Sequence, residues 1–333
     1  PVLPILIPLV AGAVLFLTGG RGATRDRAIG LTATVASLAV CLLLLAGSLD
    51  GEVRTYYVGD WPAPFGITLV VDRLSALMLC LTAALGLGSL LYAVGGDDRR
   101  SGHFHGLFQM QLLGINGAFL TGDLFNLFVF FEILLIASYA LQLHGGGRKR
   151  VRAALHLVAL NLVGSSIFLI GIGAVYAATG TLNLADLTLR VAAAGAEQAG
   201  LLRAGGLLLL LVFALKAALV PLGFWLPPAY GSAAPPVAAL FAIMTKVGVY
   251  AILRVHGLVF GPDAGPAALL ALPWLVPVGL ATIAAATLGV LASSDLQRLL
   301  AYLAVSYTHL RAHETLTPIA DAVFCVERGG GGG

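Results

Sequence analysis

Three ionisable side chains occur in the middle of long apolar runs of this sequence. Glu132 lies in LFNLFVFFEILLIASYAL, Lys216 in LLLLLVFALKAALVPLGFWLP and Lys246 in VAALFAIMTKVGVYAIL. A charged side chain at the centre of a membrane span costs at least ~2.5 kcal/mol, so it is expected to face protein or water and to serve a function. About eleven apolar residues flank Lys216 on either side, or ~16 Å of helix, which is beyond a lysine's reach to the headgroups.

These residue types suit proton transfer. Burial favours the neutral form of a lysine, and a nearby carboxylate favours its charged form. A lysine under both influences can load and release a proton near neutral pH, whereas an arginine keeps its charge. No arginine lies in the middle of an apolar run. We therefore expect Glu132, Lys216 and Lys246 to carry protons; the alternative is a structural pairing or snorkelling of the lysines.

Prolines follow Lys216 closely in the sequence. Pro221 comes five residues after Lys216, and Pro227, Pro228, Pro235 and Pro236 follow. A proline inside a helix removes a backbone hydrogen bond and kinks or breaks the helix. Broken membrane helices line polar cavities. We expect a break near Pro221, with Pro227 as a second structural position; a simple kink is the alternative.

Other polar residues within the spans are secondary candidates. Amides and hydroxyls that could hold a water chain, or could only join helices, are Gln109, Gln111, Asn116, Asn126, Asn161, Ser165 and Ser166. Histidines at or near span ends, each a relay or a structural residue, are His103, His105, His144, His156 and His256. His309, His313 and Glu314 have metal-ligand spacing, but the tail that contains them argues against a metal site.

The elements that must position these residues are membrane helices. The chain of 333 residues is 59% hydrophobic and 11% charged, with a mean hydropathy of +0.96, whereas soluble domains carry about 25% charged residues. A spanning helix needs roughly 20 apolar residues. Runs of that kind predict spans at 2–18, 29–47, 72–95, 105–122, 124–143, 153–178, 204–227, 236–260 and 266–292, with a tenth beginning near Leu296. The fold class is therefore all-α and polytopic.

Basic residues predict the orientation of these spans. Nine of them lie in the loops after the first, third and fifth spans: Arg21, Arg25, Arg27, Arg99, Arg100, Arg148, Lys149, Arg150 and Arg152. Five lie in the alternate loops and adjoining helix ends: Arg54, Arg73, Arg190, Arg203 and Arg254. Loops rich in lysine and arginine stay on the cytoplasmic side. We therefore predict an outside N-terminus, with the 49–71 loop as a small hairpin on the outer face.

Two features limit what the chain can contain. There is no CxxC pair, GxxxxGK loop, HExxH or GxGxxG fingerprint, so we expect no metal, no cofactor and no nucleic-acid partner. After Ser306 the spanning pattern stops, and SYTHLRAHET resembles translated sequencing-adapter sequence. Residues 306–333, which include Cys325, are therefore predicted to be a non-native tail.

The motifs together resemble the antiporter-like membrane subunits. Lys216-Ala-Ala-Leu-Val-Pro221-Leu-Gly-Phe-Trp225-Leu226-Pro227 is similar to the family pattern K-x-x-x-x-P-x-x-x-W-L-P. The stretches Thr245–Tyr250 and Gly122–Glu132 look most like the D subunit of Mrp-type sodium/proton antiporters. The stretches from Trp61-Pro62 to Asp72–Ala76 and Asp295–Tyr302 match the family as well. The resemblance implies an antiporter-like fold and a proton pathway through Glu132, Lys216 and Lys246.

The resemblance also implies how the chain is divided and what it works with. Full-length members have about fourteen helices in two inverted repeats, so the implied parts are 1–103 with helices one to three, 104–260 as the first repeat, and 261–305 as the start of a truncated second repeat. The implied partners are other membrane subunits, the bilayer, protons and Na⁺, in the plasma membrane of a prokaryote. A proton-pumping subunit of an NADH–quinone oxidoreductase or membrane-bound hydrogenase is the alternative, and a non-transporting scaffold is the third.

Overall fold

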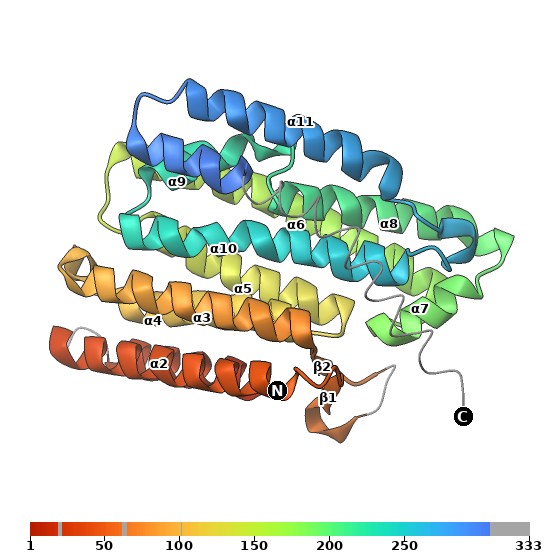
Figure 1. The fold of residues 1–333 in the computed structure, drawn as a ribbon, viewed down its shortest axis with the longest axis horizontal. Coiled ribbons are helices and arrows are strands. Elements are labelled where there is room, and N and C mark those ends of the chain that lie inside the picture. The colour runs from red at the N-terminus through yellow and green to blue at the C-terminus, as the bar shows by residue number, and fades with distance from the viewer. Residues whose placement is uncertain (19–21, 62–64, 101, 307–333) are drawn as a thin grey trace.

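The computed structural model describes residues 1–18, 22–61, 65–100 and 102–306, which form a bundle of roughly aligned helices (Figure 1). The long helices are α1 (Leu3–Thr18), α2 (Ala23–Gly47), α3 (Arg73–Val94), α4 (Phe104–Leu120), α5 (Leu124–Gln142), α6 (Arg148–Thr179), α8 (Ala196–Lys216), α10 (Pro235–Ile252) and α11 (Leu272–Leu291). The described chain ends in a helical stretch over 296–306. The predicted spans at 2–18 through 153–178 and at 236–260 and 266–292 are confirmed as helices.

Seven helices of the described chain are long and apolar enough to cross a membrane. They are α2, α3, α5, α6, α8, α10 with its π-helical extension η4 (Leu253–Val259), and α11 with the short η5 (Gly265–Ala267) before it. α1 is apolar but shorter, with 16 residues. The protein is a multi-pass membrane protein, because only a bilayer solvates so many exposed apolar helix faces.

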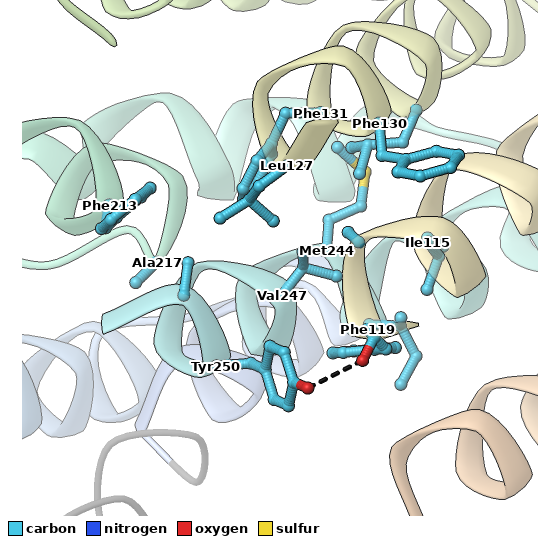
Figure 2. Packing of buried hydrophobic residues seen from close by; sticks show 14 of the residues in the cluster. Ile115, Phe119, Leu127, Phe130, Phe131, Phe213, Ala217, Met244, Val247 and Tyr250 are labelled. Carbon is cyan, nitrogen blue, oxygen red and sulfur yellow. Dashed lines mark hydrogen bonds between the residues drawn. The ribbon is translucent and has the colours of Figure 1, made fainter. Parts of the chain in front are cut away.

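Helix α4 is enclosed by other helices of the bundle. It packs against α1, α3, α5 and α10, and all but two of its 17 residues are buried. Protein therefore surrounds α4, so it can carry Gln109, Gln111 and Asn116 where a lipid-facing helix could not. Figure 2 shows Ile115 and Phe119 of α4 in an apolar cluster with α5 and α10, where the Tyr250 hydroxyl donates to the Phe119 carbonyl at 2.7 Å.

The loops divide between the two ends of the bundle. The end that holds Arg25, η2 (Asp97–Arg100) and Arg150 is called the inside end here, and the opposite end the outside end. The outside end carries β1 (Arg54–Tyr57), β2 (Thr68–Val71), the short η1 (Val58–Asp60) between them, and α7 (Leu184–Ala192) (Figure 1). β1 and β2 are antiparallel, with Arg54 opposite Val71 and Tyr57 opposite Thr68. The predicted hairpin in the 49–71 loop is confirmed.

Two elements differ from the sequence-based expectation. The run 204–227 is not one straight span: α8 ends at Lys216, and η3 (Leu222–Trp225) and α9 (Leu226–Ser232) follow. α7 was not predicted, because nine residues are too few for a span; Asn183 caps it by accepting hydrogen bonds from the backbone N–H groups of Ala185 and Asp186. The predicted tail lies, from residue 307 on, outside the described residues.

Candidate functional site

The site begins where α8 stops, at Lys216. Pro221 has no N–H to continue the helix, and the freed backbone groups find partners elsewhere. The Val220 N–H donates to Thr282 Oγ1 of α11 at 2.9 Å, and Trp225 Nε1 donates to the Leu215 carbonyl at 3.1 Å. Pro227 lies in the first turn of α9, where a missing N–H costs no hydrogen bond. The break predicted near Pro221 is therefore present and stabilised by α11.

Lys216 is the most deeply buried lysine of the described chain, at 5% exposure. Its Nζ donates a hydrogen bond to Asn161 Oδ1 of α6 at 3.0 Å. The same ammonium lies over the Phe131 ring, 5.7 Å from the centroid, a favourable arrangement for a cation. No carboxylate among the described residues lies within 4.0 Å of it. The immediate partner of this buried lysine is thus a neutral amide.

The Glu132 side chain of α5 contacts α6 one helical turn from Asn161. The Ser165 hydroxyl donates to Glu132 Oε1, and Asn161 and Ser165 are four residues apart, so they lie on one face of α6. Glu132 is close enough to Lys216 to interact with it electrostatically. The polar groups therefore follow one another from Glu132 to Ser165, Asn161 and Lys216 across three helices.

Lys246 is placed differently. It lies on α10, is half-buried, and has no hydrogen bond or ion pair to other parts of the described chain. Two residues further on, Gly248 lets α10 approach the break closely: a Cβ at position 248 would lie 2.5 Å from Ala217 N and 2.7 Å from Lys216 C. The structure thus brings Glu132 and Lys216 together through α6, whereas Lys246 lies next to the helix contact without joining their hydrogen bonds.

A cavity of about 810 Å³ lies beside the break. Its lining includes Pro221, Trp225 and Pro227 from the break and α9, and Thr282 from α11. Charged residues near the inside end line it as well: Lys149, Arg152, Asp295 and Arg298. Most of the lining is apolar, but these charged residues can hold water at the opening. The broken segment therefore adjoins a vestibule with a charged opening on the side of the basic loops.

The secondary candidates divide into joined and isolated groups. Asn116 Nδ2 donates to the Pro4 carbonyl at 2.8 Å, and Asn126 Nδ2 donates to Thr121 Oγ1 at 2.9 Å, so both join segments of the fold. Ser166 bonds its own helix at the Leu162 carbonyl. Gln111 has no hydrogen-bond partner for its side chain within the described residues. Among the histidines, His103 and His156 are exposed, whereas His105, His144 and His256 are buried.

Sequence reasoning missed a charged cluster at the outside end. Arg254 forms an ion pair with Asp72, the N-cap of α3, and its Nε donates to the Tyr250 hydroxyl at 2.9 Å. Burial raises the pKa of Asp72, but Arg254 and the hydrogen bonds from Ser75 outweigh this effect and hold that pKa below its usual value. The spacing of four between Tyr250 and Arg254 on one helix face was the available signal.

Comparison with known proteins identifies relatives of this chain. Residues 121–310, more than half of the chain, match the family described as NADH:quinone oxidoreductase/Mrp antiporter, TM. The chain is 50% identical over 307 residues to the D subunit of a "Probable K(+)/H(+) antiporter" of Rhizobium meliloti (strain 1021), covering 90% of this chain and 57% of that protein. It is 38% identical over 320 residues to the N subunit of an NADH-quinone oxidoreductase of Desulforudis audaxviator (strain MP104C), covering 92% of this chain and 61% of that protein.

A solved structure agrees with this match. A chain in the structure of the Mrp complex from Dietzia sp. DQ12-45-1b superposes with a TM-score of 0.83 and 31% sequence identity, over 93% of this chain and 57% of that chain. The chain thus spans about 60% of the length of the relatives it matches. The family match, the sequence identity and the superposition show that this chain belongs to the NADH:quinone oxidoreductase/Mrp antiporter transmembrane family.

Proposed function

We propose that this chain forms the proton-carrying part of a membrane subunit in a multi-subunit monovalent cation/proton antiporter. The observation that carries the proposal is Lys216: a buried lysine at a helix break, held by the neutral Asn161 side chain. A lysine locked to a carboxylate keeps its proton, whereas one held by an amide can give it up. The antiporter assignment rests on the relatives, of which the antiporter protein of Rhizobium meliloti is 50% identical.

The proposed pathway uses the three ionisable residues in turn. Glu132, linked to Ser165, favours the charged form of Lys216 while the two stay close. A change of spacing at the break weakens that influence, and Lys216 releases its proton toward Lys246. Water from the vestibule beside Pro221 supplies or removes protons at the inside end. Coupled movement of Na⁺ or K⁺ is proposed from the names of the relatives.

The proposed setting is a complex in the plasma membrane of a bacterium. Other membrane subunits and the bilayer would be the partners, and the chain itself would transport ions without cofactor or metal. The exposed apolar residues on most helices suit lipid or neighbouring subunits.

A redox-complex subunit is the second candidate, since the NADH-quinone oxidoreductase protein of Desulforudis audaxviator is 38% identical. In that case the same residues would pump protons while partner subunits carry the electrons. Neighbouring genes for cluster-bearing subunits would separate this candidate from the antiporter. A scaffold without transport is the third candidate, and it predicts that Lys216 and Glu132 tolerate apolar replacement.

The test compares Lys216→Ala and Lys216→Arg in everted membrane vesicles that contain the complete complex. Cation-induced ΔpH is measured, with the amount of assembled complex determined in parallel. We expect both variants to lose ion-coupled proton movement, because arginine keeps its charge at accessible pH, and Lys216→Arg to assemble as wild type. The exposed Lys149→Arg is the matched control: it keeps the positive charge at the opening of the vestibule, where no proton release is proposed, and should transport normally. Near-normal transport by Lys216→Arg would show that charge alone suffices and would end the proton-carrier role.

A further inference from the structure

A second group of buried ionisable residues lies at the inside end, between α2, η2 and α4. The Asp98 carboxylate accepts two hydrogen bonds from Arg27, Nε to Oδ2 at 2.6 Å and Nη2 to Oδ1 at 2.7 Å. His105 Nε2 lies 3.1 Å from the same Oδ2. The side chains of Asp98 and His105 are 2% and 7% exposed. None of these residues contributes to the Glu132–Lys216 series.

The pairing with Asp98 determines which ring nitrogen of His105 is free. A carboxylate only accepts hydrogen bonds, so the neutral imidazole must carry its hydrogen on Nε2 and leave a lone pair on Nδ1. Nδ1 is buried and has no partner among the described residues. It faces α2, because a Cβ at Gly30 would lie 2.8 Å from it. His105 therefore presents an unused hydrogen-bond acceptor to the protein interior.

Gln109 brings a second unpaired polar atom to the same part of the bundle. It lies one turn along α4 from His105 and donates Nε2 to the Gly30 carbonyl at 3.1 Å and to Thr34 Oγ1 at 3.0 Å. Its Oε1 is buried and has no partner within the described chain. An unpaired buried polar group is costly, so two such acceptors next to Gly30 favour a ligand between α2 and α4.

The ligand must donate hydrogen bonds. His105 Nδ1 and Gln109 Oε1 are both acceptors, so they cannot bond to each other, but one water molecule can donate to both. An added proton on Nδ1 serves equally, because it turns Nδ1 into a donor. We propose that His105 is a second protonatable site of this protein, oriented by Asp98 and reached by water from the inside end through the α2–α4 interface. Its ligands are water and the proton.

The charged groups near His105 are mostly paired with one another. Arg27 of α2 pairs with Asp98 of η2. In the first turn of α2, Arg25 pairs with Asp26, and within η2, Arg100 pairs with Asp97, while Arg99 is exposed. His144 lies beyond Phe104, with 4.7 Å between the ring centroids, and its Nε2 is 2.6 Å from the Asp97 carbonyl oxygen. α1 contains no ionisable side chain, and the inner half of α3 contains only the exposed Tyr92. Protonation of His105 thus adds one positive charge next to a balanced ion pair.

Thiol accessibility tests whether the site holds water. In a background without native cysteines, Thr34→Cys places a thiol beside the Gln109 amide, at the proposed water site, and Val35→Cys places one on the adjacent exposed position. Silver ions in water should protect the thiol of Thr34→Cys from later alkylation at least about tenfold faster than that of Val35→Cys, since thiols react as thiolates and need water to ionise. Equal rates at the two positions would show that the site is dry and would overturn the proposal.

Histidine nuclear magnetic resonance tests the proton itself. The ¹⁵N spectrum of wild type minus that of His105→Asn isolates the His105 signal in membranes, and His103→Asn gives the control for an exposed imidazole two residues away. We expect an Nε2–H neutral ring at high pH that becomes an imidazolium as the pH falls, while the complex stays assembled. A ring that stays neutral, or one that is charged at every pH, would overturn the protonatable site. Neither measurement depends on transport through Lys216.

Discussion

Lys216 Nζ of α8 and Asn161 Oδ1 of α6 are 3.0 Å apart, and this amide is the first partner of the buried ammonium. Asn161 and Ser165 stand one turn apart on α6, and Ser165 bonds Glu132. The acid and the base of the proposed pathway therefore each bond a neutral side chain on the same face of α6. This arrangement lets a small shift of α6 or of the broken α8 change the influence of Glu132 on Lys216.

The neutral character of Asn161 is open to a direct test. Asn161→Asp would place a carboxylate at the position of the amide, and the resulting buried ion pair would hold the proton on Lys216. We expect ion-coupled proton movement to fall at least about tenfold, which corresponds to ~1.4 kcal/mol of added stabilisation of the charged lysine. Complex content should stay near that of wild type. Asn161→Ser, which keeps a neutral oxygen, is the control, and equal transport by both variants would contradict the role given to the amide.

Gly248 sets the distance between α10 and the break. An added Cβ would meet Ala217 N at 2.5 Å and Lys216 C at 2.7 Å, and both are backbone atoms that cannot rotate away. Gly248→Ala should therefore destabilise the protein by about 1–3 kcal/mol through overpacking, visible as a lower melting temperature, and should reduce transport. Gly173→Ala on α6 is the matched control, because nothing lies within 4 Å of its added Cβ. Equal stability of the two variants would refute the close approach.

The Asp72–Arg254 pair should make stability depend on pH. The pKa of Asp72 is held below its usual value, so the pair stabilises the folded state above the unfolded pKa of about 3.9 and loses this effect as the pH falls through the folded pKa. Asp72→Asn should lower the free energy of unfolding by about 2 kcal/mol near neutral pH, and the difference should shrink below about pH 4. Thermal unfolding in detergent measures it. The exposed Glu52→Gln should show no such difference, and a difference for Asp72→Asn that persists at low pH would contradict the pairing.

Arg150 connects the end of α9 to the loop before α6. Its Nε donates to the Ser232 carbonyl at 2.9 Å and its Nη1 to the His144 carbonyl at 2.8 Å. Arg150→Ala should cost about 1.5–3 kcal/mol and speed hydrogen exchange over residues 226–232. Arg148→Ala removes an exposed charge from the same first turn of α6 and should change stability by no more than ~0.5 kcal/mol. Equal hydrogen-exchange rates over residues 226–232 in the two variants would show that Arg150 does not anchor α9.

The distribution of basic residues predicts which face of the membrane each loop occupies. Lys149→Cys should react with a membrane-impermeant thiol reagent only in everted vesicles, and Trp61→Cys only in intact cells, both in a background without native cysteines. The structure places the β hairpin and α9 at opposite ends of the bundle (Figure 1), so the two positions must label from opposite sides. Labelling of Lys149→Cys in sealed cells would reverse the assigned orientation.

Much of the architecture follows from the sequence through physics that acts along the chain. Apolar runs of about 20 residues become spanning helices, because lipid offers the backbone no hydrogen bonds and the helix must satisfy its own. The cost of burying a charge identified Glu132, Lys216 and Lys246 before any partner was known. Pro221 predicted the break through its missing N–H. That Glu132, Lys216 and Lys246 form a proton pathway is a proposal.

The partners of these residues were decided only by the tertiary structure. Lys216 and Asn161 are 55 positions apart, and Val220 and Thr282 are 62 apart, so each contact depends on how two separate helices are rotated and how closely they approach. Local periodicity indicates which face of a helix is apolar, but most faces of these helices are apolar because lipid surrounds them. Helix packing therefore decides that Asn161, and not Glu132, is the hydrogen-bond partner of Lys216, and that Asp98 is the partner of His105. Glycines such as Gly248 and Gly30 permit this packing.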